Sequence, residues 1–177
     1  EAYDNRLLRS TLAPFYGRIE RMLAGMLTRK PVRLEDVSDV VREHLFDVDL
    51  QGNDLNVWTY EIARKCVRYG HVGVLVDAPA AGQNGRPYWV SYTPRDILGW
   101  RSEIADGKQQ LTQLRLKEEL TVPDGLYGEK RVEQVRVLTP GAFELHQKNE
   151  KGDYEIVDEG RTSLSEIPFS VAYSNRV

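Results

Sequence analysis

Three side chains in the middle of the sequence could take part in acid–base chemistry: His71, Asp77 and Asp96. Asp77 follows a short apolar run, and many enzymes place a carboxylate at the end of a buried strand. To act as a hydrolase, Asp77 would need His71, Asp96 or Glu118 to converge on it. The structural alternative is that Asp77 ends a strand two residues before Pro79, which cannot continue a ladder. We favour the structural role, because a catalytic site needs several convergent groups.

Cys66 is the only cysteine in the chain. The chain therefore has no internal disulfide and no CxxC zinc site, which suits a reducing compartment. A Cys66–His71 dyad is conceivable, but Cys66 lies on the apolar stripe of a predicted helix, where free cysteine usually acts as a small hydrophobe. The histidines His44, His71 and His146 lie in different predicted elements without metal-ligand spacing. We therefore predict neither a catalytic cysteine nor a metal site.

The acidic segment DVDLQGND, residues 47–54, resembles a calcium loop at first sight. Its twelfth position would fall at Val57 or Trp58 instead of the required glutamate, and its glycine is misplaced. We therefore predict a loop with capping carboxylates. The sequence also lacks a phosphate-binding P-loop, a GxGxxG motif and a GxSxG motif. We predict that the chain is not an enzyme and uses no cofactor.

The elements that must position these residues begin with helices, which we expect over residues 1–70. Apolar residues recur at helical spacing through the first region: Leu7, Leu8, Leu12, Phe15, Ile19, Met22, Leu23, Met26 and Leu27. Pro14 predicts a kink or break there. A second helix is predicted in LEDVSDVVREHLFDV, with an apolar face formed by Val37, Val40, Val41 and Leu45.

A third helix is predicted over residues 54–69. Asn53 or Asp54 is the expected N-cap, and Gly70 is the expected C-terminal stop. Its apolar stripe is Leu55, Trp58, Ile62, Cys66 and Tyr69, which we expect to be buried.

From residue 71 onward the apolar period changes from helical to alternating. The segments HVGVLVD and PYWVSY are separated by a loop containing Asn-Gly, which favours an antiparallel pair. Further strand-like segments follow, with turn signals ADGK, PDGLYG, TPG and NEKGD between them. The predicted fold class is α+β, with N-terminal helices over residues 1–70 and an antiparallel, hairpin-rich sheet region over residues 71–177.

Charge is segregated along the chain although the net charge is only −3. Residues 1–33 hold seven Lys and Arg against three Asp and Glu, whereas residues 34–54 hold one Arg against seven Asp and Glu. The balance argues against a protein coated in basic residues, and no apolar run is long enough for a membrane span. We expect the two charged segments to meet between subunits, with these candidate contact residues: Arg18, Arg21, Arg29, Asp36, Asp39 and Glu43. The alternative is that both segments face water or pair within one chain.

Several segments together resemble a family of phage and prophage proteins, labelled DUF4055 and regarded as portal-like. The matching features are the AYxNR opening, the GMLTRKP exit, the DxDLxGxxL helix start, YGxxGVLVDxP and RPYxxxYxPxDIxxW. The resemblance covers most of the chain and is densest over residues 1–100. Pro14 departs from the pattern of the first helix.

The resemblance implies a structural part of a portal ring at the capsid vertex, through which DNA is packaged and ejected. A self-assembled, dodecameric ring would contact terminase, capsid and head–tail adaptor proteins and enclose double-stranded DNA, with no membrane involved. It would reside in the virion, and in the host cytoplasm during assembly. The chain resembles one wing-like portal domain, and because it starts and stops within predicted elements we expect it to be a fragment of a longer chain.

Two other functions remain open on the sequence. One is a head–tail adaptor or minor virion protein that shares the helical module. The other is a small hydrolase built around Asp77, Asp96 and His71, which requires those side chains to meet.

Overall fold

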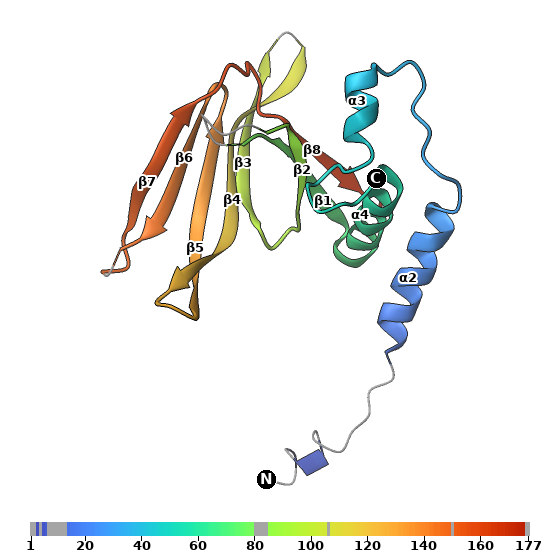
Figure 1. Ribbon diagram of the computed structural model, residues 1–177, viewed down its shortest axis with the longest axis horizontal. Coiled ribbons are helices and arrows are strands. Elements are labelled where there is room, and N and C mark those ends of the chain that lie inside the picture. Colours follow the sequence, from blue (N-terminus) through green and yellow to red (C-terminus); the bar gives the residue numbers. More distant parts are fainter. Residues whose placement is uncertain are drawn as a thin grey trace.

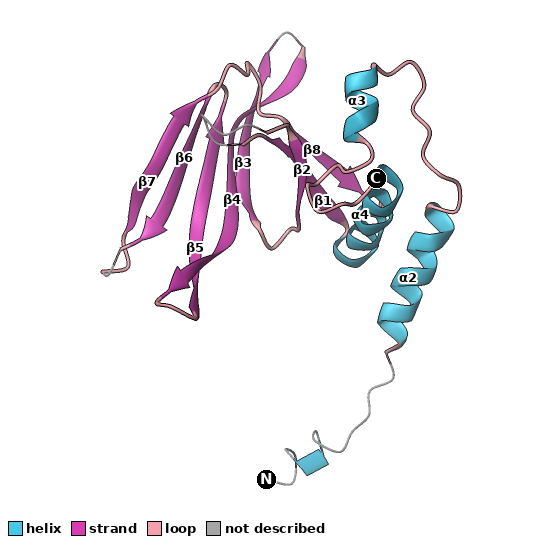
Figure 2. Ribbon diagram, viewed as in Figure 1, coloured by secondary structure: helices cyan, strands magenta, loops and turns pink. Residues whose placement is uncertain are grey.

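The computed structural model of the chain describes residues 3, 5–6, 14–79, 85–105, 107–149 and 151–175. Three helices lie on one side of this part of the chain, and two antiparallel sheets lie on the other (Figure 1). The helices all come before the strands in sequence, as Figure 2 shows. The α+β class predicted from the sequence, with helices first and antiparallel sheet second, is therefore confirmed.

The first helix of the described region, α2 (Phe15–Leu27), begins directly after Pro14. Pro14 has no N–H to donate, so a helix start is a position where it is tolerated. The predicted break at Pro14 agrees with this start. The predicted apolar positions Leu7, Leu8 and Leu12 lie outside the described residues.

The second helix, α3 (Asp39–His44), is much shorter than the sequence pattern predicted. Asp36 has a φ of 56°, a left-handed conformation that no α-helix accommodates, so the helix starts only after it. Ser38 then caps the helix, with its side chain accepting a hydrogen bond from the Val41 N–H. The predicted apolar face is not buried along its length, because Val40 is 66% exposed and Val41 is 42% exposed.

The third helix, α4 (Leu55–Tyr69), agrees with the prediction in both position and caps. The Asp54 carboxylate accepts a hydrogen bond from the Val57 N–H at 2.8 Å, which satisfies one of the free donors of the first turn. Gly70 ends the helix with a φ of 87°, a conformation that costs glycine little. Of the predicted stripe, Cys66 is buried and the other four residues are half-buried.

The strands form two separate antiparallel sheets. The smaller sheet has the order β2-β1-β8 and the larger has the order β3-β4-β5-β6-β7. The bounds are β1 His71–Asp77, β2 Tyr88–Tyr92, β3 Ile97–Ala105, β4 Lys108–Asp124, β5 Gly128–Thr139, β6 Ala142–Lys148, β7 Tyr154–Arg161 and β8 Phe169–Tyr173. The predicted hairpins are confirmed from β3 to β7, and β1 pairs with β2 as expected.

After β7 the chain leaves the larger sheet, and the last strand, β8, pairs with β1 in the smaller one. In this pairing His71 lies opposite Tyr173. This return closes the smaller sheet around β1 as its central strand. The local pattern gave no sign of it, because strand partners far apart in sequence leave no periodic signal.

The hydrophobic core lies between the two sheets. Its buried side chains come from both of them and from the segment before β8: Leu75, Tyr92, Leu114, Leu116 and Ile167. Helix α4 packs on the opposite face of the smaller sheet, against β1 and β8, and α2 packs on α4. The order across the molecule is therefore large sheet, small sheet, α4 and α2 (Figure 1).

Strand alternation assigns the faces of β1. Gly73 and Leu75 face the large sheet, because a Cβ on Gly73 would meet Phe169 and Ile97, and Leu75 lies in the core. Asp77 has the same parity and therefore points toward the large sheet as well. Among the described residues, no helix is long and apolar enough to cross a membrane.

Candidate functional site

A cluster of polar side chains is enclosed between the two sheets, at the end where β1 stops and β2 starts. Asp77 and Tyr88 contribute from the small sheet, and Glu118 and Arg136 contribute from β4 and β5 of the large sheet. Tyr92 and Gln134 complete it, and both are buried, with exposed fractions of 6% and 3%. We call these six residues the inter-sheet polar cluster.

Arg136 is the centre of the inter-sheet polar cluster. Its Nη1 donates to Oδ2 of Asp77 at 2.7 Å, which links β5 to β1. Its Nε forms an ion pair with Oε1 of Glu118 at 2.9 Å, without the alignment of a hydrogen bond. One cation therefore faces two carboxylates, so the cluster has a formal net charge of −1.

The remaining carboxylate oxygens all have donors within the chain. Oδ1 of Asp77 accepts the N–H of Ala78 at 2.9 Å, and Oδ2 also accepts the Tyr88 hydroxyl at 3.3 Å. The oxygens of Glu118 accept the Tyr92 hydroxyl and the Gln134 amide, each at 2.7 Å. The carboxylate oxygens are therefore satisfied, whereas Nε of Arg136 makes only its ion pair with Glu118. Satisfied carboxylates are typical of a structural network, because enclosed polar groups stabilise a fold only when they have partners.

The electrostatics of the cluster hold its cation charged and its tyrosines neutral. Burial alone would lower the pKa of Arg136, but the negative charges of Glu118 and Asp77 outweigh it and raise that pKa. Burial, reinforced by the charge of Glu118, raises the pKa of the Tyr92 hydroxyl strongly. Burial and the charge of Asp77 raise the pKa of Tyr88 in the same way. These tyrosines are poor acids, so they act here as hydrogen-bond donors.

Only one of the residues proposed to meet Asp77 does so. Glu118 joins it through Arg136, as described. His71 lies at the opposite end of the same strand, six residues and therefore about 20 Å away, and its ring lies beside that of Tyr173. Asp96 accepts hydrogen bonds from the backbone and hydroxyl of Thr93, in the turn between β2 and β3. This geometry argues against a hydrolase assembled from these three residues.

Sequence reasoning missed Arg136 and the two tyrosines, although a signal was present. Charged residues occupy inward-facing positions of otherwise apolar strands: Glu118 follows Leu116 in alternation, and Arg136 precedes Leu138. A charge at such a position predicts a buried partner of opposite charge. Which residue is the partner of Glu118 depends on the register of β4 against β5. In that register Arg136 lies opposite Leu116, two residues before Glu118 on the same face.

Cys66 packs as a small hydrophobe. It is 7% exposed, and its thiol donates to the carbonyl of Ala172 in β8 at 3.5 Å. Burial raises the pKa of this thiol, which disfavours the thiolate that a nucleophile requires.

In the segment 47–54 two carboxylates accept hydrogen bonds from the loop itself, and Asp47 also forms an ion pair with Arg86 at 2.9 Å. Asp49 accepts the N–H of Gln51 and the side-chain amide of Asn53, while Asp47 accepts the N–H of Gly52. Burial opposes ionisation of Asp49, but these hydrogen bonds dominate and lower its pKa. Across the described ranges, no group of three His, Cys, Asp or Glu side chains could hold a metal ion.

A polar cleft of about 320 Å³ lies between this loop, α4 and β2. Trp58 and Trp89 meet edge to face in it, with ring centroids 5.0 Å apart. The amine of Lys65 donates to the hydroxyl of Ser91 at 2.6 Å across the cleft. These contacts fasten α4 to β2.

Helix α2 attaches to α4 through a buried carboxylate. Glu20 is 2% exposed, and its oxygens accept hydrogen bonds from Arg64 Nε at 3.0 Å and Arg68 Nη2 at 2.6 Å. Burial would raise the pKa of Glu20, but the two guanidinium groups outweigh it and lower that pKa. Ala24, one turn later, is fully buried beside it. The face of α2 that packs against α4 therefore carries a charged residue and a small one. The apolar spacing in the sequence did not predict this face.

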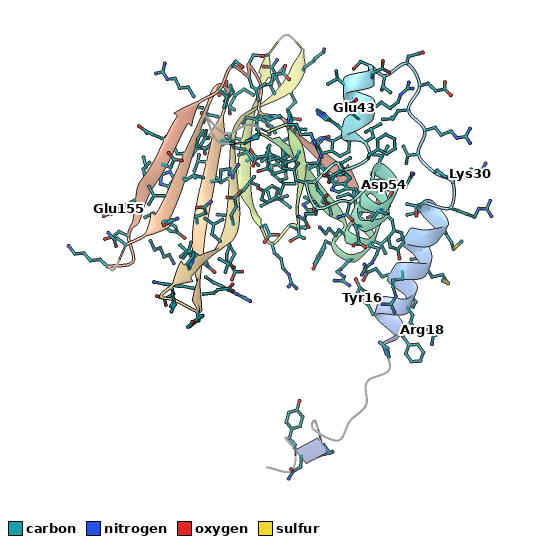
Figure 3. The ribbon with its side chains drawn as sticks, in the orientation of Figure 1. Tyr16, Arg18, Lys30, Glu43, Asp54 and Glu155 are labelled. Atoms are coloured by element: carbon teal, nitrogen blue, oxygen red, sulfur yellow. The ribbon has the colours of Figure 1, made fainter. Side chains whose placement is uncertain are left out.

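The six candidate subunit-contact residues are all exposed. Among the described residues, none of them makes an ion pair or a side-chain hydrogen bond: Arg18, Arg21, Arg29, Asp36, Asp39 and Glu43. Figure 3 shows Arg18 and Glu43 at opposite ends of the helical region. These six side chains therefore face water in a single copy, and no ion pair forms between any two of them.

The chain matches no protein-family model, and no curated protein matches it in sequence.

Proposed function

We propose that this chain is a structural subunit of a phage portal ring, which sits at the capsid vertex and lets DNA pass during packaging and ejection. The proposal rests on the sequence motifs described above, and one structural observation carries it further. The six candidate contact residues are exposed and form no ion pair among the described residues, and Figure 3 shows Arg18 and Glu43 at opposite ends of the helical region. Two different complementary surfaces on one molecule favour head-to-tail contacts, and such contacts close into rings when the rotation allows.

The inter-sheet polar cluster fits a structural role as well. Its one cation bridges carboxylates of both sheets, so its effect is to fix how the sheets pack. In the proposed ring the sheets would form a rigid body that holds the helical region in place. The partners of the ring would be terminase, capsid and head–tail adaptor proteins, with duplex DNA in its channel.

Electron microscopy of the full-length protein tests the proposal. We expect closed rings of a fixed subunit number, with a channel wide enough for duplex DNA. Subunit counting also separates a portal from a head–tail adaptor or minor virion protein. Single subunits or open filaments at every protein concentration would overturn the portal assignment.

A further inference from the structure

Helix α2 carries its apolar residues on the side that faces solvent. Four side chains at helical spacing form a continuous stripe, with exposed fractions from 51% to 67%: Phe15, Ile19, Met22 and Met26. The opposite side of the helix holds Glu20 and Ala24 against α4. An amphipathic helix normally buries its apolar face, so this arrangement leaves the α2 stripe available for a partner.

A second apolar surface lies around α3. A groove of about 270 Å³ is lined by these residues: Val32, Leu34, Val37, Arg42, Leu45, Phe46, Asp54, Leu55 and Asn56. Phe46 is 75% exposed and Leu34 is 46% exposed, so much of the apolar lining faces solvent. We call this the α3 groove.

The charges around the two surfaces are opposite in sign. Arg18 and Arg21 flank the α2 stripe on the same helix. The α3 groove has Arg42 and Asp54 in its lining, and Arg33 adjoins it in sequence. Three more carboxylates adjoin lining residues and give the surroundings of the groove a net negative charge: Glu35, Asp36 and Glu43. An apolar centre with a polar, charge-complementary rim is the usual anatomy of a protein–protein interface. Within one copy α2 packs on α4, so its stripe is free to meet another molecule.

We propose that the α2 stripe of one copy docks into the α3 groove of a second copy of this chain. This contact rests on the proposed ring function and would supply the apolar core of the interface between subunits. Methionine and phenylalanine side chains of α2 enter the groove. The arginines beside them meet the acidic residues at its rim. Flexible Met22 and Met26 suit a groove of irregular shape. Because the two surfaces differ, the contact is head-to-tail and propagates from copy to copy.

Cross-linking of the full-length protein tests the contact. Two single-cysteine variants are made in a cysteine-free background (Cys66→Ala): Met22→Cys in the α2 stripe and Leu34→Cys in the α3 groove. After the two variants are mixed, a short bismaleimide should join Met22→Cys to Leu34→Cys and give a covalent dimer. Leu126→Cys, in the β4–β5 turn where Leu126 is 85% exposed and so more accessible than Leu34, should give no product with Met22→Cys.

A substitution that removes the apolar character provides a second readout. Met22→Glu should abolish the cross-link between Phe15→Cys and Leu34→Cys and reduce self-association at least tenfold. Its melting temperature should stay at the value of the parent chain, because Met22 is 58% exposed in a single copy. A fall in melting temperature without a change in self-association would show that α2 uses this face within its own chain and would overturn the proposal.

The outcomes separate this contact from the ring itself. Closed rings without the Met22–Leu34 product would overturn the contact and leave the portal assignment standing. Cross-linked dimers or open chains without closed rings would support the contact and overturn the portal assignment. Cross-linking of Met22→Cys to itself would indicate a symmetric helix pair and would also overturn the contact.

Discussion

Nη1 of Arg136 lies 2.7 Å from Oδ2 of Asp77, and this ion pair joins β5 of the large sheet to the last residue of β1 in the small sheet. The residues are 59 positions apart in sequence. Glu118 approaches the same guanidinium from the neighbouring strand β4. One cation held between two carboxylates therefore links the two sheets beside their shared hydrophobic core.

Arg136→Ala should destabilise the fold by about 3 kcal/mol, because it leaves two largely enclosed carboxylates without their cation. The measurement is urea unfolding followed by tryptophan fluorescence. The matched control is Arg131→Ala, also on β5. Arg131 forms an ion pair with Glu119, but its side chain is 78% exposed. The control should change stability by less than about 0.5 kcal/mol. Equal effects of the two substitutions would contradict the role that we assign to Arg136.

Glu20→Gln should weaken the attachment of α2 to α4 by roughly 1–2 kcal/mol, since charged hydrogen bonds to Arg64 and Arg68 are lost. The effect should depend on pH. The pKa of Glu20 is lowered in the fold, so its stabilisation is present above its ordinary value of 4.5 and is lost as the pH falls through the folded pKa.

The pH dependence of Glu20 is measured as the difference in melting temperature between the parent chain and Glu20→Gln. This difference should be constant from neutral pH down to about 5 and should shrink below 4.5. A difference that grows on acidification would mean that the folded pKa of Glu20 is raised. Subtracting the melting temperature of Glu20→Gln at each pH removes the contribution of the other carboxylates, which the two proteins share.

Gly73→Ala should destabilise the chain by about 2 kcal/mol, because the added methyl overlaps the ring of Phe169 between the sheets. Gly25→Ala is its control, since a Cβ at Gly25 meets nothing within 4 Å and alanine favours the interior of α2. The control should raise stability by up to about 1 kcal/mol. Thermal melts of both variants check the pair, and a neutral Gly73→Ala would show that the sheets are not closely packed there.

Cys66 should react slowly with a chromogenic thiol reagent in the folded protein. The thiol is buried and its pKa is raised by that burial, so both access and the thiolate fraction are reduced. We expect the rate to be at least roughly tenfold lower than in urea-unfolded protein at the same pH. Stoichiometric labelling at the unfolded rate would place the stripe of α4 on the outside.

Reversal of the basic contact residues should reduce the yield of full-length rings, because it places like charges across the proposed contact. The first variant changes three arginines to glutamate: Arg18, Arg21 and Arg29. Yield should partly recover when three acidic residues are changed to lysine in the same chain: Asp36, Asp39 and Glu43. Electron microscopy counts the rings.

The control for that reversal makes the same change in net charge elsewhere, on the exposed hairpins of the large sheet. It changes three other basic residues to glutamate: Lys108, Lys130 and Arg131. Normal ring yield is expected from it. Normal yield from the first reversal too would rule out the charged contact while leaving the portal proposal in place.

The sequence by itself determined the elements whose signals are local. Asp54 and Gly70 mark the ends of α4, because capping and left-handed termination involve only neighbouring residues. The hairpins from β3 to β7 follow from turn residues such as Gly125 and Gly141, both of which have positive φ. The fold class was predictable as well, because helix caps and hairpin turns are both local signals.

Only the tertiary structure decided which surfaces are buried. The apolar stripe of α2 faces solvent because Glu20 finds two arginines on α4, a pairing across more than forty residues that no helical period reveals. Asp77 acquires its role from Arg136, through the packing of two sheets rather than through either strand. A periodic pattern specifies which residues share a face, but the partner of that face is set by long-range contacts and their electrostatic balance.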